Sequence, residues 1–258
     1  MNNLFARRDD VIEDYHGTMV ADPYRWLENP TSAGTLNWVE AQNAATAQYI
    51  SAIPARKKIQ ERMTALWDYP KYSVPVKRGD RYFFHKNTGL QNQSVLYMQH
   101  TLQGEAVVVI DPNTLSEDGT TALTNQALSK DGELLAYGVS SSGSDWQEIK
   151  IRQVDNGTDY PEVICWCKFS SIAWHHDNQG FFYNRLPEPG TVPEEDQSNY
   201  SRVYWHTLDT PQSGDQLIYE RPEAKELSFS PLSLTTAPTW CCTSGTAPSR
   251  RIASTTAM

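Results

Sequence analysis

A repeat with a period of 46 residues is the feature that most limits the folds open to this chain. Each copy places an apolar strand end, a polar pair, a tight turn with Asp and an apolar strand in the same order, over 128–137 and 173–183. The two Asp residues, Asp131 and Asp177, are 46 residues apart. That period suits one four-stranded blade of a β-propeller, because each blade needs its neighbour to cover its apolar face. Two unrelated hairpins of a β-sandwich are the alternative that the period leaves open.

Short β-rich segments separated by turns continue this pattern from residue 72 onward. The first of them are spaced about 12 residues apart, as in an antiparallel meander. They are Arg81–His85, Ser94–Met98, Ala106–Ile110, Leu134–Tyr137, Glu148–Val154, Phe181–Tyr183 and Arg202–His206. The pair Asn156-Gly157 predicts a tight turn among them. The segment Leu186–Tyr200 is rich in Pro, Glu, Gln and Ser, which predicts a long surface loop.

The chain divides into three parts by its residue pattern. Residues 1–70 form an N-terminal helical segment, with apolar residues at three- and four-residue spacing over Thr35–Ser51 and a second helix over Arg56–Leu66. Residues 71–231 form an incomplete β-propeller. Residues 232–258 form a tail that differs from the rest, because it contains no Asp, Glu or Lys and 11 of its 27 residues are Ser or Thr.

The balance of charge excludes one class of partner. The chain has 22 Lys and Arg against 31 Asp and Glu, so its net charge is −9. Nucleic-acid binding rests on clustered cations that neutralise phosphates, so we expect no nucleic-acid partner. No apolar run approaches the roughly 18 to 20 residues of a membrane-spanning helix, and the N-terminus lacks the apolar stretch of a signal peptide. The sequence thus predicts a cytoplasmic protein without a membrane partner.

Five separated motifs resemble the N-terminal half of the prolyl oligopeptidase family, in the same order, between about residues 14 and 231. They are Asp14–Gly17, Val20–Glu28, Asp68–Tyr72, Asn87–Tyr97 and Tyr137–Trp146. The resemblance implies a helical segment that packs on an α/β-hydrolase domain, a seven-bladed propeller that caps the active site, and a Ser-Asp-His triad in the hydrolase domain that follows. The expected fold is therefore mainly β: about three blades of a seven-bladed-type propeller after an α-helical segment, with the α/β-hydrolase domain missing.

The sequence offers no residues for acyl transfer. A serine hydrolase of this kind carries its nucleophile in a G-x-S-x-G turn, and that motif does not occur in the 258 residues. We therefore assign no catalytic residue. Adjacent histidines in a strand point to opposite faces, so His175 and His176 make a poor metal site, and the cysteines lack zinc-type spacing. The cysteines fall in two close pairs, Cys165/Cys167 and Cys241/Cys242. We expect neither metal nor cofactor.

The aromatic residues are mostly expected to form blade core. This expectation covers those within strand-like runs, Trp146, Trp174, Tyr183 and Tyr204. One further aromatic residue is singled out by the resemblance: Phe169 matches a position that lines the substrate pocket from the propeller side in the family. Simple core packing is the alternative for Phe169. The segment Cys165-Trp166-Cys167 just before it departs from the usual family pattern.

The tail begins where the repeat calls for another tight turn with Asp. One permitted back-translation of Leu232–Thr246, read in another frame, gives an Asp-Asp-Gly turn followed by an apolar strand. We therefore expect that the tail is a translation in a shifted reading frame.

The residues and the resemblance together predict a function. We expect the N-terminal and propeller region of a post-proline-cleaving serine endopeptidase that acts on short peptides, with the propeller gating substrate access and this chain inactive on its own. The implied partners are short proline-containing peptides in the full-length enzyme and the chain's own missing hydrolase domain. A stand-alone, non-catalytic binding module of the propeller type is the alternative.

Overall fold

The computed structural model describes residues 5–233, 240–246 and 249–254. The chain forms two compact units, Met1–Trp67 and Asp68–Met258. None of the helices within the described ranges has the length and apolar character that a membrane-spanning segment requires.

The first unit contains a short hairpin and two helices. Strands β1 (Ile12–Tyr15) and β2 (Thr18–Ala21) pair antiparallel, and the 3-10 helix η1 (Arg25–Glu28) leads to α1 (Ala33–Ser51) and α2 (Arg56–Trp67). The hydroxyl of Ser32 accepts a hydrogen bond from the backbone N–H of Thr35 and so caps α1. Both helices predicted from the sequence are therefore present. Most of their larger apolar side chains are exposed.

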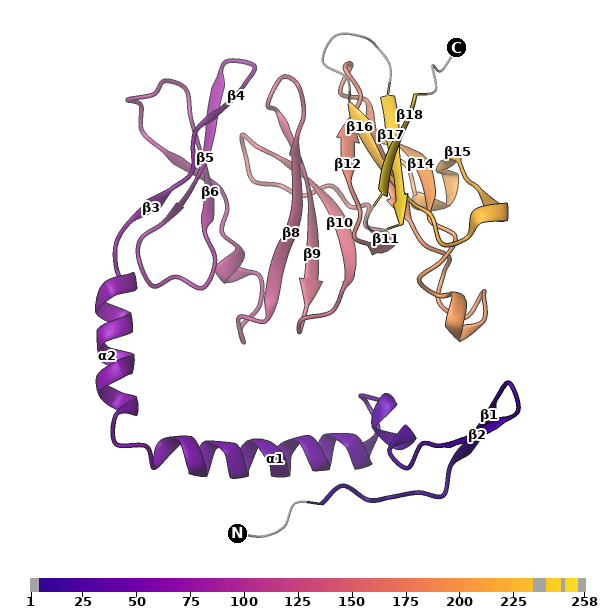
Figure 1. Ribbon diagram of the computed structural model, residues 1–258. Helices are drawn as coiled ribbons and strands as arrows, with labels where there is room; N and C mark the ends of the chain where they lie inside the picture. Colours follow the sequence, from indigo (N-terminus) through magenta and orange to yellow (C-terminus); the bar gives the residue numbers. More distant parts are fainter. Residues whose placement is uncertain (1–4, 234–239, 247–248, 255–258) are drawn as a thin grey trace. The chain divides into compact units, whose positions relative to one another are not determined.

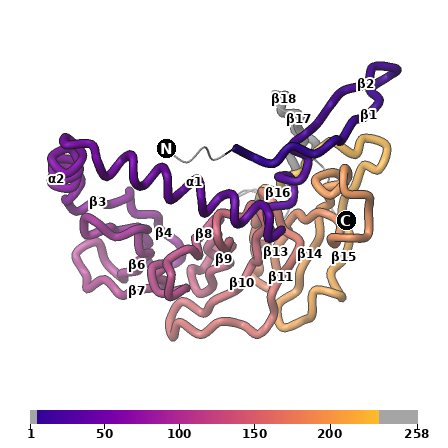
Figure 2. The backbone as a smooth tube through the Cα atoms, turned by 90° about the horizontal axis from the view of Figure 1, so that it is seen from below, coloured from indigo at the N-terminus to yellow at the C-terminus, as the bar shows by residue number. Residues whose placement is uncertain are grey.

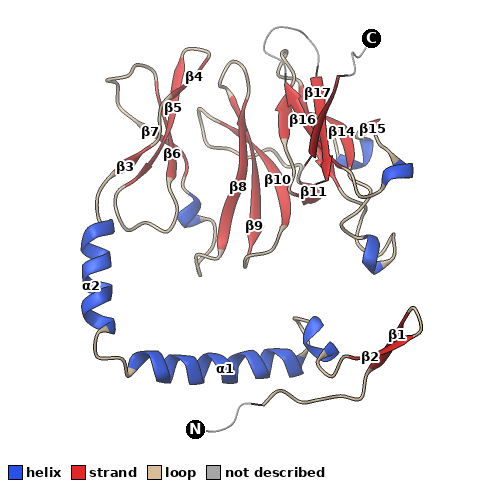
Figure 3. Ribbon diagram, in the orientation of Figure 1, coloured by secondary structure: helices blue, strands red, loops and turns tan. Residues whose placement is uncertain are grey.

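The second unit is a succession of antiparallel sheets (Figures 1 and 3). The first sheet contains β3 (Lys71–Tyr72), β4 (Val76–Arg78), β5 (Arg81–Asn87), β6 (Val95–Gln99) and β7 (Val107–Ile110). The second contains β8 (Thr121–Leu128), β9 (Leu134–Ser141), β10 (Trp146–Gln153) and β11 (Ile164–Lys168). The third contains β12 (Ile172–Trp174), β13 (Gly180–Arg185), β14 (Arg202–Thr207) and β15 (Gln216–Tyr219). The fourth contains β16 (Ser228–Ser233), β17 (Trp240–Thr246) and β18 (Ser249–Ser254). Short 3-10 helices lie between strands: η2 (Pro112–Thr114), η3 (Glu194–Asp196), η4 (Gln212–Gly214) and η5 (Pro222–Ala224).

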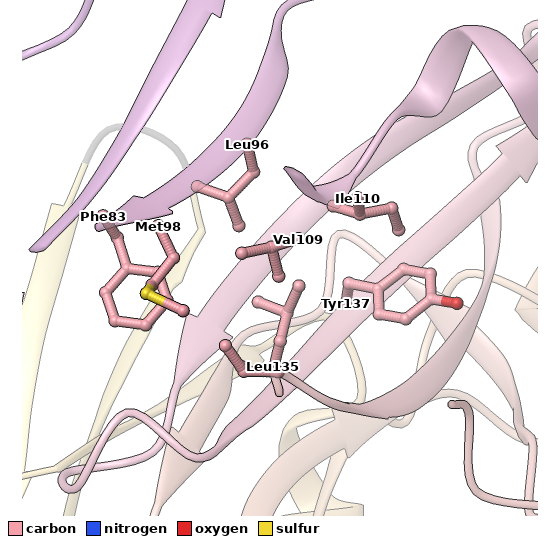
Figure 4. Packing of buried hydrophobic residues seen from close by; sticks show 8 residues of the cluster. Phe83, Leu96, Met98, Val109, Ile110, Leu135 and Tyr137 are labelled. Atoms are coloured by element: carbon pink, nitrogen blue, oxygen red, sulfur yellow. The ribbon is translucent and has the colours of Figure 1, made fainter. Parts of the chain in front are cut away.

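Each sheet packs its apolar face on the next sheet in the chain, and Figure 2 shows the same succession from below. Between the first and second sheets, side chains of β5, β6 and β7 meet Leu135 and Tyr137 of β9 (Figure 4). The second sheet meets the third through residues such as Ile149 and Phe181. The third meets β16 through Phe229, which is 2% exposed. This serial packing is that of propeller blades and not of two facing sheets, so the predicted partial propeller is confirmed and the sandwich is excluded.

The repeated turns join the first three sheets to one another. Asp131 lies in the β8–β9 turn, and Asp177 lies in the equivalent β12–β13 turn of the third sheet. The backbone N–H of Gly79, in the β4–β5 turn, donates to the carbonyl of Lys130 at 3.1 Å. The N–H of Lys130 in turn donates to Asn178 Oδ1 at 3.0 Å. Successive turns are therefore linked by hydrogen bonds as well as by the core beneath them. Of the predicted tail, residues 234–239, 247–248 and 255–258 lie outside the described residues.

Candidate functional site

Phe169 lies in the short connection from β11 to β12, and its side chain is exposed. It is 69% exposed and has a φ of 51°. A non-glycine residue in this left-handed conformation is uncommon and stores strain of about 1 to 3 kcal/mol, which is often found at functional sites. Core packing of Phe169 is therefore excluded by its exposure.

The connection that carries Phe169 shares one end of the sheets with two others. In an antiparallel meander, alternate connections lie at opposite ends, so the β9–β10 turn, the β11–β12 connection and the β13–β14 loop lie together. The cross-strand pairing of Trp146 with Lys168 brings the first two of these side by side. The sequence Leu186–Tyr200, predicted as a surface loop, is the third connection and contains η3.

Lys168 joins these three segments through its ammonium group. Its Nζ lies 5.8 Å from the ring centroid of Trp146 and 5.6 Å from that of Phe169. The same atom donates to Ser198 Oγ, at 3.3 Å, and lies 3.9 Å from Asp145 Oδ2. Cations placed in this way over aromatic rings attract the rings by roughly 0.5 to 1 kcal/mol at exposed sites. The charged group of Lys168 therefore interacts with two aromatic side chains and with the long β13–β14 loop.

A second cation lies between aromatic rings nearby. The guanidinium carbon of Arg185 is 5.3 Å from the ring centroid of Trp166 and 4.0 Å from that of Tyr204. Trp166 has a φ of 58°, and the pairing of β10 with β11 shifts register beside it, so β11 bulges at this residue. The carbonyl of Trp166 accepts the N–H of Leu186 at the start of the long loop. We call the five residues Trp146, Trp166, Lys168, Phe169 and Arg185 the aromatic end.

The long loop beside the aromatic end is anchored by an ion pair. Asp196 Oδ1 accepts from Lys225 Nζ at 2.7 Å and from Asn199 Nδ2 at 2.9 Å. The hydrogen bond from Lys225 is the main cause that holds the pKa of Asp196 below its usual value, and Asn199 adds to it. The loop is therefore tied both to the second sheet, through Lys168, and to the segment that follows β15.

The five residues of the aromatic end include no histidine and no carboxylate. The paired histidines lie in the β12–β13 turn, where His175 Nδ1 is 2.8 Å from Asp177 Oδ1. The described residues contain no group of three His, Cys, Asp or Glu side chains that could hold a metal ion. Cys165 and Cys167 are free thiols, and burial raises the pKa of Cys167 to about 12. A reactive thiolate is therefore not available at Cys167 near neutral pH.

Sequence reasoning identified only one of the five residues of the aromatic end as a site residue. Of the aromatic residues expected in the core, Trp174 and Tyr183 are buried, and Tyr204 is half-buried and packs against the core between the second and third sheets. Trp146 is half-buried at the end of its strand. Lys168 and Arg185 were not singled out, because their roles depend on strand pairing that the sequence does not display. The aromatic end therefore combines exposed aromatic rings with two cations on one end of the sheets.

Comparisons with known proteins agree on one family. Residues 5–246 match the family model described as the prolyl oligopeptidase N-terminal beta-propeller domain. The chain is 40% identical over 215 residues to a prolyl endopeptidase of Elizabethkingia miricola, covering 83% of this chain and 30% of that protein. It is 37% identical to prolyl oligopeptidase A of Galerina marginata, covering 87% of this chain and 35% of that protein. A solved structure of prolyl oligopeptidase B from Galerina marginata, bound to a 25mer macrocyclization substrate, matches with a TM-score of 0.80 at 27% identity, over 95% of this chain and 37% of that chain. The chain thus spans about a third of the length of the relatives it matches.

Proposed function

The chain belongs to the prolyl oligopeptidase family, of which it represents part of the N-terminal region, and we propose that it is the non-catalytic, substrate-admitting part of a post-proline-cleaving serine endopeptidase. In this proposal the substrates are short proline-containing peptides. The propeller gates their access, and a hydrolase domain supplies the catalytic residues.

The exposed, strained Phe169 is the observation that carries the proposal for substrate contact. Its ring and that of Trp146 flank Lys168 at the aromatic end. A proline ring packs well on an aromatic face, because both are rigid and apolar, and little side-chain entropy is lost on binding. Phe169 is accordingly proposed as a substrate contact and Lys168 as the residue that positions it.

The exposed apolar residues of α1 and α2 support a partner for the first unit. Within this unit, Thr35 is the single buried residue among those described, while Leu36, Ile59 and Met63 are more than half exposed. Helices that bury no apolar face gain little stability in water. We propose that a hydrolase domain covers them.

Inactivity of the chain alone is tested directly by assay. The purified protein is incubated with a fluorogenic Gly-Pro substrate, and no turnover above background is expected, because the sequence contains no G-x-S-x-G motif. Turnover that diisopropyl fluorophosphate abolishes would contradict the proposal.

Substrate contact is tested by binding of a short proline-containing peptide, followed by tryptophan fluorescence. The variant Phe169→Ala should lose at least half of the binding signal, whereas Leu102→Ala should bind as the wild type does. Leu102 is a matched control, since it is 54% exposed and lies in the β6–β7 connection, at the opposite end of the sheets. Equal binding by both variants would refute the contact. Equal binding of peptides with and without proline would favour the stand-alone binding module instead.

We also propose that residues 232–258 are translated in a shifted reading frame. The proposal rests on their composition and on the Asp-Asp-Gly turn that another frame yields at the expected place in the repeat. Sequencing of the DNA around codon 231 tests it. An intact frame that encodes these residues would end the proposal.

A further inference from the structure

Arg185, the last residue of β13, lies between two aromatic rings that belong to different sheets. Its guanidinium carbon is 5.3 Å from the ring centroid of Trp166 on β11 of the second sheet, and 4.0 Å from that of Tyr204 on β14 of the third. An Arg that stacks on aromatic rings keeps the N–H groups at the edge of its planar guanidinium available for hydrogen bonds. The two rings therefore hold the cation in place without using its donors.

The backbone on both sides of Arg185 is fixed to the second sheet and to the connection that follows it. The carbonyl of Asn184, the residue before it, accepts the hydroxyl of Ser170, and Asn184 Oδ1 accepts the N–H of Ser171 at 2.8 Å. The residue after Arg185 donates its N–H to a backbone carbonyl of β11. Since Ser170 and Ser171 directly follow Phe169, the position of Arg185 is tied to that of the proposed substrate contact.

The positive charge of Arg185 has no counter-ion in the described part of the chain. Its cross-strand neighbour on β14 is Arg202, whose Nε lies 2.9 Å from Oε2 of Glu220. Like charges directly opposite each other destabilise a sheet, so a second carboxylate is expected beside this pair. Among the described residues none forms an ion pair with Arg185, whereas Lys168 lies 3.9 Å from a carboxylate oxygen of Asp145. Of the two cations of the aromatic end, Arg185 is therefore the one whose charge is left uncompensated.

The guanidinium of Arg185 is also accessible. The residue is half-buried, and its nitrogens are not among the buried polar atoms that lack a partner in the described residues. Its donors therefore reach solvent, where a ligand can replace water as the acceptor.

A carboxylate is the group that this arrangement fits. The fork of a guanidinium matches the two oxygens of a carboxylate, and such charge-assisted pairs are among the strong hydrogen bonds of proteins. We propose that Arg185, held between Trp166 and Tyr204, binds a carboxylate of the peptide at the aromatic end, which is the C-terminal group or the side chain of an Asp or Glu. This inference rests on the proposed function, and it narrows the substrate class to proline-containing peptides that carry a negative charge.

A role confined to joining the two sheets predicts a different behaviour. If Arg185 only holds Trp166 and Tyr204 together, its replacement loosens the aromatic end and weakens the binding of all peptides by the same factor. If it binds a carboxylate, its replacement changes the preference between charged and neutral peptides. The preference is therefore the quantity to measure.

The test compares three peptides on the whole chain by isothermal titration calorimetry near neutral pH and at low salt. They are Ac-Ala-Pro-Ala amide, the same peptide with a free C-terminal carboxylate, and Ac-Ala-Pro-Asp amide. One or both acids should bind at least about tenfold more tightly than the neutral amide, and the acid that does so identifies the source of the carboxylate. The chain carries a net charge of −9, so such a preference cannot come from its overall charge and reports a local contact.

The outcomes separate this inference from the proposed function. Equal affinity for all three peptides overturns the carboxylate site and leaves the proposed function standing. Binding of none of them overturns both. These comparisons need only the wild-type chain, so they decide the question even if a variant does not fold.

Variants assign the preference to Arg185. Arg185→Lys keeps the charge but loses the fork, so the preference should fall to about threefold or less, and Arg185→Met should abolish it. Both should bind the neutral amide within about twofold of the wild type, since that peptide offers no carboxylate. The control Arg202→Lys should keep the wild-type preference, because Arg202 already faces Glu220. Equal weakening of acids and amide by the Arg185 variants would show that the residue only joins the sheets, and would overturn the proposal.

Discussion

Replacement of Gly79 by Ala tests whether the linked turns hold the sheets together. A Cβ at Gly79 would lie 2.0 Å from the backbone carbonyl oxygen of Asp131, in the turn of the second sheet. Backbone cannot yield as a flexible side chain does, so the two turns must separate. Separation breaks the hydrogen bond from Gly79 to Lys130 and strains the one from Arg81 Nη1 to the carbonyl of Gly132, which is 2.9 Å long.

The magnitude follows from two contributions. Gly79 has a φ of 53°, and an Ala in this left-handed region costs about 1 to 2 kcal/mol. Loss of the hydrogen bond between the turns, with partial loss of the one from Arg81, adds about 1 to 3 kcal/mol. We expect Gly79→Ala to lower the free energy of unfolding by about 2 to 5 kcal/mol.

A second glycine of the same unit separates these contributions. Gly157 has a φ of 69°, but a Cβ there meets nothing within 4 Å. Gly157→Ala should therefore cost only the backbone term of about 1 to 2 kcal/mol. Both variants are unfolded in urea, followed by tryptophan fluorescence and compared at equal m-values. If the two substitutions destabilise the chain equally, the turns do not link the sheets and the reasoning is wrong.

Three further predictions concern single side chains. Tyr137→Phe should lower the free energy of unfolding by about 1 to 2 kcal/mol in urea titrations, because a partly buried hydrogen bond to the Asp159 carboxylate is lost. Asp196→Asn should increase protease cleavage within 186–200 at neutral pH. Since the pKa of Asp196 is lowered in the folded chain, its ion pair stabilises the loop above about pH 4 and is lost as the pH falls further, so the difference from wild type should vanish with pepsin in strong acid. Iodoacetamide at about pH 8 should alkylate Cys165 before Cys167, whose pKa burial raises to about 12, as peptide mapping by mass spectrometry will show; faster reaction of Cys167 would contradict its burial.

The middle strands of the sheets were predictable and several strands at the sheet edges were not. Strand β13 is covered on both faces, so Phe181–Tyr183 is a continuous apolar run that the sequence displays. Strand β8 is an edge strand of mostly half-buried residues, half of them polar, and it carries no such run. Strand β11 was missed for another reason: the bulge at Trp166 interrupts the period of two on which strand prediction depends.

The same limit explains what was missed at the aromatic end. Phe169 was found through resemblance alone, whereas the position of Lys168 between two rings depends on its pairing with Trp146. That pairing requires β11 to be known, together with its shift of register. Sites built by cross-strand neighbours are therefore visible in a sequence only when both strands and their register are visible too.

Equivalent polar groups of the second and third sheets are identified by the strand pairing and not by the sequence period. Tyr137 and Tyr183 are 46 residues apart, as the turns are, but Asp159 and Asp215 are 56 residues apart, because the long β13–β14 loop lies between Tyr183 and Asp215. A period of 46 residues therefore does not match Asp159 with Asp215. The antiparallel register does place their donors, Arg152 and His206, two residues beyond the cross-strand partners of Tyr137 and Tyr183. In the second sheet Arg152 donates to Asp159, and in the third His206 Nδ1 donates to Asp215. Each tyrosine donates to the carboxylate of its own sheet, Tyr137 to Asp159 and Tyr183 to Asp215, so equivalent polar groups of two blades are found from strand register when loops of unequal length separate them.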